Sequence, residues 1–328
     1  MAIDWEPLRS IIAANQRIVL TSHVRPDADA LGSELGMAGL LEHLGKDVRI
    51  VNASPVPSRL AFLDPEKKIK QLGTEVTEAQ ALETDVHMIL DTSAWGQLAE
   101  MGRVFKRTSA VKVVIDHHAT AEDLGAIYFK DVESEATGAL VFQAAEALGI
   151  PITPPIARAL YCAIATDTGW FRFPSTSGET MRTIGRLMES GAEPWSLYQS
   201  LYEQNSMGRM KLCSRVLSRI KLDCGGRLAS TFVRWDDYAE TASEPADTED
   251  LVNECLTIVG TVAAFIAIEQ SNRNIKVSFR SRTPIDVASV AQQFGGGGHK
   301  QAAGSIMPGP LVDAQTKVLA ALTTLLQP

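Results

Sequence analysis

The sequence contains few cysteines, and their spacing excludes a disulfide-rich fold. Cys162, Cys213, Cys224 and Cys255 lie far apart, with no C-x-x-C pair and no short secreted framework for disulfides to hold. We therefore expect all four to be reduced and to serve packing.

Long apolar runs are also absent. The most apolar segment, residues 258–268, holds 11 residues, well below the roughly 20 needed to cross a bilayer. The first 16 residues carry Asp4, Glu6 and Arg9 and contain no apolar stretch of secretory length. We expect a cytoplasmic protein without membrane contact.

An excess of positive charge is the third feature that is missing. The formal net charge is -8, which argues against a general basic groove for long duplex nucleic acid, because such binding depends on neutralising many phosphates. A small phosphorylated substrate is still compatible with this charge. Cations held by acidic residues, with a few local basic side chains, can neutralise a handful of phosphates.

The order of patterns predicts an α/β fold. At 328 residues and 45% hydrophobic, the chain is long enough for two domains with a core each. Its first half alternates short β-rich runs with helical patterns, which is typical of a parallel sheet flanked by helices. Strands are expected at 17–22, 47–51, 86–90 and 111–115, and helices at about 30–44, 135–148 and 155–166.

A helical stretch from 194 to 220 has few turn signals and is interpreted as a connector. A smaller α/β or α+β pattern follows it, with strands near 228–233, 262–268 and 275–280 and helices near 248–258, 285–294 and 311–325. We therefore predict a catalytic domain over 1–190, a helical linker over 191–222 and a smaller mixed-sheet domain over 223–328.

The first predicted strand ends in His23-Val-Arg-Pro-Asp-Ala-Asp29, which projects one imidazole and two carboxylates from a tight loop. Carboxylate oxygens suit hard divalent cations, and an added imidazole shifts the preference toward Mn, Co or Zn over Ca. The ordinary structural alternative is that Asp27 or Asp29 only caps the following helix.

Three further polar positions follow buried segments. Asp91 comes directly after the strand 86–90, where an Asp is often only a turn residue. Asp116-His117-His118 follows the strand 111–115, and Asp167 ends an apolar helix, where an unpaired carboxylate is costly. Neighbouring side chains diverge, so one His could bind a metal while the other reaches substrate, with Asp116 orienting a ring. Solvated loop histidines and a helix-end carboxylate facing water are the ordinary alternatives.

Ligand sites of parallel sheets form beyond the carboxyl ends of the strands, where all these side chains are expected. Four Asp and two His, apart from Asp116, are enough for two cations that share a carboxylate. A metal pair roughly 3.5–4 Å apart can stabilise both the attacking and the leaving oxygen of a phosphoryl displacement. The pattern therefore favours hydrolysis of phosphate esters.

The carboxy-terminal half adds an anion-binding pattern. Phe294 is followed by four glycines, His299 and Lys300, and consecutive glycines let backbone N–H groups approach an anion. Upstream, Lys276, Ser278, Arg280 and Arg282 alternate along one strand face, with Phe279 on the other. A flexible loop and an ordinary solvated strand face are the alternatives.

These motifs resemble, in order, those of the DHH/DHHA1 phosphoesterase superfamily over nearly the whole chain. The matching segments are His23-x-x-Pro-Asp-x-Asp-x-x-Gly32, Asp91, Asp116-His-His118, Thr166-Asp-Thr-Gly169 and Gly295-Gly-Gly-Gly-His299. In length and domain content the chain looks most like the stand-alone NrnA group, the nanoRNases that also act as phosphatases of 3'-phosphoadenosine 5'-phosphate (pAp).

The resemblance implies a role for each matching residue. His23 and Asp27 would hold one metal, Asp29, His117 and Asp167 the other, and Asp91 would bridge them. His118 would contact the scissile phosphate. Arg280, His299 and the backbone of Gly296, Gly297 and Gly298 would bind the far phosphate or sugar. Mn²⁺ is the usual activator in this family, and Mg²⁺ or Co²⁺ sometimes serves.

The resemblance thus implies an oligoribonuclease acting on short RNA that also dephosphorylates pAp to AMP, with a homodimer as the base-rate oligomeric state. Two alternatives stay open. One is a soluble phosphodiesterase for linear or cyclic dinucleotides, such as pApA or cyclic di-AMP. The other is a non-catalytic nucleotide sensor with the same fold, which the intact acidic and His set argues against.

Overall fold

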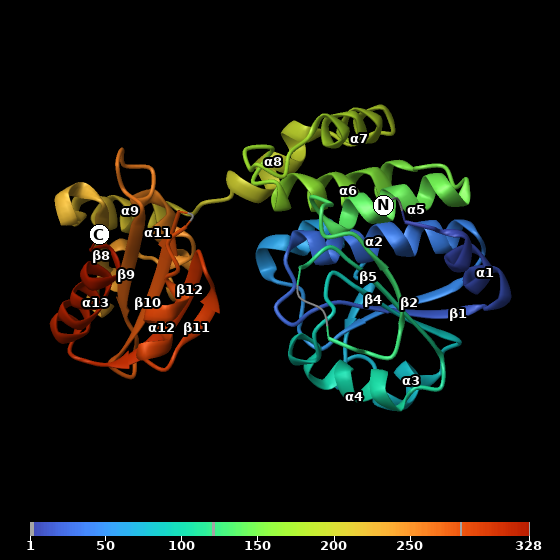
Figure 1. Ribbon diagram of the computed structural model, residues 1–328, viewed down its shortest axis with the longest axis horizontal. Coiled ribbons are helices and arrows are strands. Elements are labelled where there is room, and N and C mark those ends of the chain that lie inside the picture. The colour runs from blue at the N-terminus through green and yellow to red at the C-terminus, as the bar shows by residue number, and fades with distance from the viewer. Residues whose placement is uncertain (1–2, 120–121, 283, 328) are drawn as a thin grey trace. The chain divides into compact units, whose positions relative to one another are not determined.

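The computed structural model describes residues 3–119, 122–282 and 284–327, and these form two compact units, Met1–Glu203 and Gln204–Pro328 (Figure 1). Each unit has its own sheet and its own hydrophobic core. They are described separately below.

The first unit is built on a six-stranded sheet in the order β3-β2-β1-β4-β5-β6, with every pair parallel. Its strands are β1 (Arg17–Thr21), β2 (Asp47–Asn52), β3 (Ile69–Gln71), β4 (Val86–Leu90), β5 (Val111–Asp116) and β6 (Ile127–Lys130). Its helices are α1 (Glu6–Ala14), α2 (Ala28–His43), α3 (Glu78–Leu82), α4 (Ala99–Arg107), α5 (Thr137–Leu148), α6 (Pro154–Asp167), α7 (Gly178–Glu189) and α8 (Pro194–Tyr202).

Both faces of this sheet are covered, which explains why its central strands β1, β4 and β5 are largely apolar rather than alternating. Ile18 and Leu20 of β1 belong to the core beneath α1, α2, α5 and α6, whereas Val19 faces the opposite core beneath α3 and α4. Figure 1 shows one layer of helices on each side of the strands. Because helices cover both faces of the sheet, a polar site is expected at the ends of its strands.

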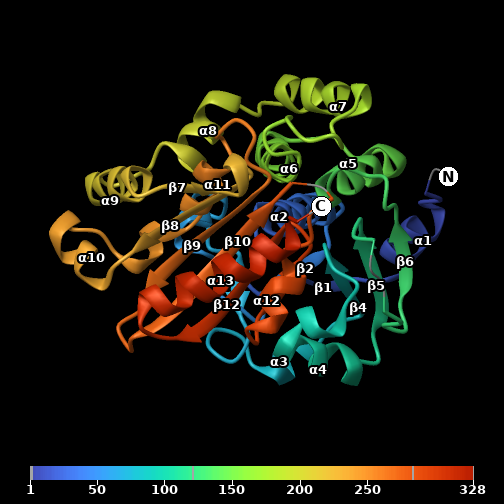
Figure 2. The same cartoon turned by 60° about the vertical axis from the view of Figure 1, so that its left-hand side comes forward.

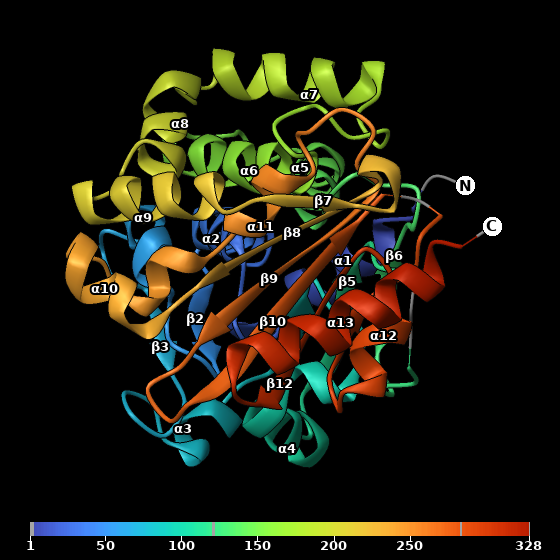
Figure 3. The same cartoon turned by 90° about the vertical axis from the view of Figure 1, so that its left-hand side faces the viewer.

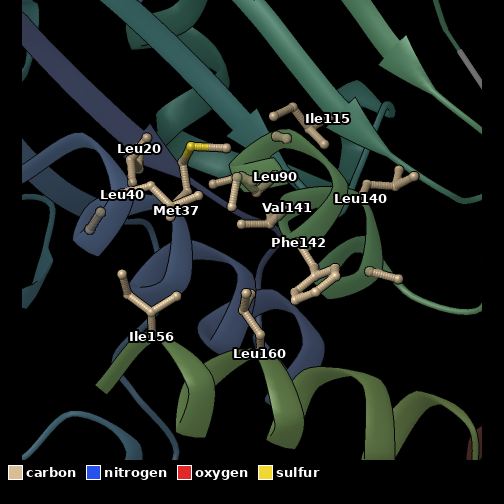
Figure 4. Close-up of a cluster of buried hydrophobic side chains, with 14 of the residues drawn as sticks. Leu20, Met37, Leu40, Leu90, Ile115, Leu140, Val141, Phe142, Ile156 and Leu160 are labelled. Atoms are coloured by element: carbon tan, nitrogen blue, oxygen red, sulfur yellow. The ribbon is translucent and has the colours of Figure 1, made fainter. Parts of the chain in front are cut away.

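Small residues bring α2 and α6 unusually close. A Cβ on Gly32 would meet the carbonyl oxygen of Ala159 at 2.4 Å, and one on Gly36 would meet the side chain of Leu160 at 2.4 Å. Figure 4 shows the apolar side chains of this layer, among them Met37 of α2 and Leu160 of α6. The close packing sets where the end of α6, with Asp167, lies relative to the start of α2.

The second unit holds a mixed six-stranded sheet in the order β11-β12-β10-β9-β8-β7, in which only β8 and β9 are parallel. Its strands are β7 (Lys221–Asp223), β8 (Leu228–Val233), β9 (Ala263–Glu269), β10 (Asn274–Ser281), β11 (Gly297–His299) and β12 (Ala302–Pro308). Its helices are α9 (Met207–Ser218), α10 (Trp235–Thr241), α11 (Leu251–Cys255), α12 (Ala288–Gln293) and α13 (Leu311–Leu325).

Helices cover this second sheet unevenly. α12 and α13 pack on one face, as Figures 2 and 3 show, and bury alternate residues of β9 and β10, including Phe265 and Phe279. On the other face α9, α10 and α11 cover β8 and β9. Along β10, Lys276 is exposed and Ser278 and Arg280 are half-buried, so the predicted alternation is observed.

The predicted fold class is confirmed: a parallel sheet flanked by helices precedes a smaller mixed-sheet unit. Two helix predictions need correction. The stretch 194–220 is two helices, α8 and α9, because the Ser206 side chain accepts a hydrogen bond from Arg209 N and begins a new helix. The helix expected at 248–258 is reduced to α11, because Asp250 has a left-handed φ of 63°.

Within the described residues, no helix combines the length and the apolar character that a bilayer crossing requires.

Candidate metal centre

The sheet order reverses between β1 and β4, which are neighbours although they are not consecutive in sequence. Loops leaving such a switch point diverge and create a crevice at the carboxyl ends of the strands. His23 lies two residues beyond β1, and Asp91 follows β4 directly. Asp91 has a φ of 65°, a left-handed conformation that Asp tolerates better than most residues.

His23, Asp27 and Asp91 form the first donor group. The Nδ1 atom of His23 lies 3.0 Å from the carbonyl oxygen of Val24, so this nitrogen carries the proton that is donated. Its Nε2 atom lies 3.8 Å from Asp27 Oδ1 and 3.4 Å from Asp91 Oδ2. The nitrogen that faces the carboxylates is therefore the one that can bind a metal.

Asp29, His117 and Asp167 form the second donor group. His117 repeats the arrangement of His23, because its Nδ1 atom lies 3.0 Å from the carbonyl oxygen of Ser134. Its Nε2 atom lies 3.7 Å from Asp29 Oδ2 and 3.4 Å from Asp167 Oδ2. Asp91 Oδ1 is 3.6 Å from the same nitrogen, so Asp91 contacts both groups.

Backbone and hydroxyl donors hold the carboxylates in place. Asp29 accepts hydrogen bonds from Thr137 N at 2.8 Å and Gly138 N at 2.9 Å, at the first turn of α5, where the helix dipole favours an anion. The Thr137 hydroxyl donates to Asp91 at 2.9 Å. Asp27 Oδ1 accepts from the backbone N–H groups of Asp29 and Ala30, so Asp27 is also the N-cap of α2.

Asp116 lies behind His118 rather than facing the other carboxylates. Its Oδ1 accepts from His118 Nδ1 at 2.9 Å, and its Oδ2 accepts from the Ser93 hydroxyl and from Lys130 Nζ, both at 2.6 Å. Burial alone would raise the pKa of Asp116, but these hydrogen bonds outweigh it and hold the pKa below its usual range. Asp116 therefore stays ionised and fixes the His118 ring.

Burial and like charge oppose full ionisation of the remaining acids. Burial, together with the negative charge of Asp29, raises the pKa of Asp167 to about 7. Burial also raises the pKa of Asp29 and, more strongly, that of Asp91. Burial lowers the pKa of His23, but its hydrogen bonds to Asp27 and Asp91 outweigh this and raise it to about 11.

The residues present fit a pair of divalent cations. Asp29 and Asp91 are buried next to two further carboxylates, and such a cluster is costly unless positive charge compensates it. The two groups combine carboxylate oxygens with imidazole Nε2 atoms held for coordination. A third group, Asp91, His117 and His118, overlaps both. The donor set is that of Mn²⁺, Co²⁺ or Zn²⁺ chemistry more than of Ca²⁺.

All six predicted metal ligands, with Asp116 and His118, thus lie together at one edge of the first sheet. The predicted substrate-binding residues belong to the second unit. Arg280 Nη1 donates to the carbonyl oxygen of Phe279 at 3.0 Å, and its Nη2 lies 3.7 Å from Asp250. The side chain of His299 lies outside the described part of the structure.

Close backbone packing requires two of the glycines before His299, Gly296 and Gly298. A Cβ on Gly296 would meet the carbonyl oxygen of Gly304 at 2.1 Å, and one on Gly298 would meet that of Ala302 at 2.5 Å. Gly297 pairs with Gly304 between β11 and β12. The run is therefore partly a strand rather than only a flexible loop.

Several supporting residues were not found from the sequence. Ser93 and Lys130 hold Asp116, and Thr137 holds Asp91. Lys130 is the last residue of β6, a short strand that was not predicted. Asp91 was found because it lies at the end of a predicted strand, and without a predicted β6 the same criterion could not identify Lys130. Thr137 gives no local signal, since its role depends on where α5 begins in space.

The doubly wound sheet and its cluster of acids and imidazoles are those of a metal-dependent phosphoester hydrolase. The model of the "DHH family, N-terminal domain" matches residues 17–164, and that of the "DHHA1 domain" matches residues 228–327. The chain belongs to the DHH/DHHA1 family.

Similar proteins agree over almost the full length. A "Bifunctional oligoribonuclease and PAP phosphatase NrnA" of Thermus thermophilus is 30% identical, covering 97% of this chain and 94% of the relative. The protein of that name from Bacillus subtilis is 25% identical, covering 96% of each. The crystal structure of an exopolyphosphatase-related protein from Bacteroides fragilis superposes with a TM-score of 0.92 at 28% identity, covering 98% of this chain and 95% of the other.

Proposed function

We propose that the protein hydrolyses short oligoribonucleotides to mononucleotides and removes the 3'-phosphate of pAp, using two divalent cations, with Mn²⁺ as the preferred activator. The observation that carries the proposal is the pair of donor groups that both contact Asp91. The names of the full-length relatives in Thermus thermophilus and Bacillus subtilis support the substrate class.

The two donor groups define the roles that we propose. His23 and Asp27 hold one cation, Asp29, His117 and Asp167 hold the other, and Asp91 serves both. When bound, the cations neutralise charge on the phosphate and acidify a water molecule for attack. The ionised Asp116 accepts a hydrogen bond from Nδ1 of His118 and fixes this ring, which leaves Nε2 to contact the phosphate.

In the second unit we propose that Arg280, the backbone N–H groups of Gly297 and Gly298, and His299 bind a phosphate or sugar away from the cleaved bond. The N–H group of Gly296, which the resemblance also implied, already donates to the carbonyl oxygen of Ala291 at 2.9 Å. Backbone N–H groups in glycine runs suit anions, and a guanidinium suits a phosphate. Because short RNA fragments and pAp arise inside cells, this function implies a cytoplasmic enzyme. A homodimer stays a prediction.

A substrate panel tests the proposal. Purified protein with Mn²⁺, and separately with Mg²⁺, is incubated with labelled di- to pentaribonucleotides, pAp, pApA and cyclic di-AMP. Turnover of the short RNAs and of pAp is expected, faster with Mn²⁺. No turnover of either, or turnover of cyclic di-AMP alone, would contradict it.

A matched pair of variants links that activity to the donor groups. Asp91→Asn removes the charge that both groups share, and we expect loss of Mn²⁺ binding by calorimetric titration and at least about a 100-fold loss of kcat. Asp47→Asn is the control, because Asp47 begins β2 at the opposite end of the sheet and is exposed. Equal Mn²⁺ binding by both variants would remove Asp91 from the centre.

A further inference from the structure

Helix α8 carries an aromatic stripe that stays partly exposed. Trp195, Tyr198 and Tyr202 follow each other at helical spacings of three and four, so they share one face. Their exposed fractions are 69%, 40% and 43%, whereas Leu197 is 2% exposed and belongs to the core. The leucine face thus attaches the helix, and the aromatic face is turned away from the core.

Trp170 holds the two tyrosines of this stripe in a defined position. Its ring lies edge-on to Tyr198, with centroids 5.1 Å apart, and to Tyr202, with centroids 5.6 Å apart. A further edge-on contact to the buried ring of Tyr161 spans 6.0 Å. Edge-to-face contacts of this kind fix ring orientation, so the corner is a rigid surface rather than a set of loose side chains.

A shallow cavity of about 400 Å³ opens at this corner, lined by Trp170, Pro194, Trp195, Tyr198, Gln199 and Glu203. Its volume lies in the range of small-molecule sites. The lining combines aromatic rings with one amide and one carboxylate and includes no Lys or Arg. A flat heteroaromatic ring with hydrogen-bonding edges fits this chemistry, whereas a phosphate does not.

The cavity is close in sequence to the proposed metal centre. Trp170 is three residues beyond Asp167, and three residues span at most about 11 Å when fully extended. The actual path is shorter, because Trp170 N donates to the carbonyl oxygen of Ala165 at 2.6 Å. A base joined through its ribose to a phosphate at Asp167 is therefore within reach of Trp170.

We propose that Trp170, Trp195 and Tyr198 form a stacking site for one nucleobase of the oligoribonucleotide, next to the phosphate that is cleaved. This inference rests on the proposed function and adds a subsite to it. Stacking on aromatic faces accepts every base, which suits an enzyme that degrades RNA fragments of any sequence. Gln199 and Glu203 line the same cavity.

The test combines variants of Trp195 with substrates that lack one base. For a diribonucleotide with Mn²⁺, Trp195→Ala is expected to raise KM roughly ten-fold with little change in kcat, since stacking is a binding contact. Two analogues, each abasic at one nucleotide, locate the contact. With the analogue that lacks the stacked base, wild type and Trp195→Ala are expected to have equal KM. With the other analogue, the roughly ten-fold difference remains.

Control variants separate stacking from other losses. Trp195→Phe keeps a ring and is expected to stay within about two-fold of wild type, whereas Trp195→Leu is expected to behave like alanine. Trp235→Ala removes a tryptophan of α10 that is 43% exposed and should leave KM unchanged. Thermal melting of each variant confirms that it is folded.

The inference and the proposed function fail in distinguishable ways. If wild type cleaves no oligoribonucleotide, the proposed function fails, and the subsite is judged by anisotropy of a labelled diribonucleotide, in which Trp195→Ala should weaken binding roughly ten-fold. An unchanged KM or Kd in Trp195→Ala would overturn the inference. An equal rise in KM of Trp195→Ala on both abasic analogues would also overturn it. If sedimentation showed that the substitution only dissociates a dimer, the stripe would be an interface between two copies and the inference would fail.

Discussion

Two adjacent histidines, which directly follow β5, face different partners. The Nδ1 atom of His117 is engaged by the carbonyl oxygen of Ser134, which leaves Nε2 among three carboxylates. The Nδ1 atom of His118 is engaged by Asp116, and 45% of its side chain is exposed. The second histidine can therefore reach a substrate that the first cannot.

Replacing His118 should separate catalysis from metal binding. We expect His118→Ala to lower kcat by about 10²- to 10⁴-fold, the range for a group that acts on the reacting phosphate. Mn²⁺ affinity should change little, because each proposed cation keeps all of its proposed ligands. Steady-state kinetics and calorimetric titration give the two readouts. A loss of Mn²⁺ binding as large as that of Asp91→Asn would make His118 a ligand instead.

His87 offers a pH prediction away from the metal centre. It is fully buried in β4, packs edge-on to Phe105, and neither ring nitrogen has a hydrogen-bond partner within the described residues. Burial, with a small contribution from the positive charge of Lys112, lowers the pKa of His87 to about 3. The unfolded chain therefore binds this proton below about pH 6.5, while the folded chain does not until about pH 3.

His87→Leu should consequently protect the protein from acid. As pH falls from about 6.5 toward 3, wild type loses stability at this residue, and at pH 5 the loss amounts to about 2 kcal/mol in the free energy of unfolding. The leucine variant lacks this loss. Urea unfolding at pH 8 and at pH 5 measures it, since at pH 8 only packing differs. An equal pH dependence in both proteins would show that the buried ring is protonated or has a partner.

At the scale of elements, the contact between α2 and α6 determines whether the second donor group can form. Asp29 lies in the first turn of α2, and Asp167 is the last residue of α6. Because Gly32 has no Cβ, the two helices can approach so closely that an added Cβ would overlap the backbone of Ala159. Helix packing therefore sets the distance between two proposed ligands of one cation.

Gly32→Ala should impair both stability and metal binding. The added methyl group has to displace backbone, and we expect a loss of about 1–3 kcal/mol in the free energy of unfolding and weaker Mn²⁺ binding. Gly185→Ala is the control: Gly185 lies inside α7 with nothing within 4 Å of an added Cβ. There the better helix propensity of alanine should stabilise by up to about 1 kcal/mol. Equal melting temperatures of the two variants would contradict the packing argument.

At the scale of the whole molecule, the two units have separate cores, and every proposed metal ligand lies in the first. The fragment 1–203 ends after α8, so no described strand of the first sheet is cut. We expect this fragment to unfold cooperatively in circular dichroism and to bind Mn²⁺ with the stoichiometry of the full chain. Activity on oligoribonucleotides should fall, because Arg280 and the glycine run are missing. A fragment without a cooperative transition would show that the first unit depends on the second.

Much of the architecture could be predicted from local pattern. The strands β1, β2, β4 and β5 were predicted within a residue or two, because buried parallel strands are short, apolar and rich in β-branched residues. The short strands β3, β6, β7 and β11 were missed, because each has four residues or fewer, which is too few for a periodic signal. The seven-residue strand β12 was missed as well. Their positions depend on pairing with strands distant in sequence.

By itself the sequence determined which residues can bind a cation and that they follow buried segments, since residue chemistry and strand apolarity are local properties. Only the tertiary structure decided which of them share a group. The strand order placed His23 beside Asp91, and the approach of α2 to α6 brought Asp29 and Asp167 to the same imidazole. The exposed aromatic face of α8 was likewise decided by packing, because a helix with two apolar faces carries no local signal for which one is buried.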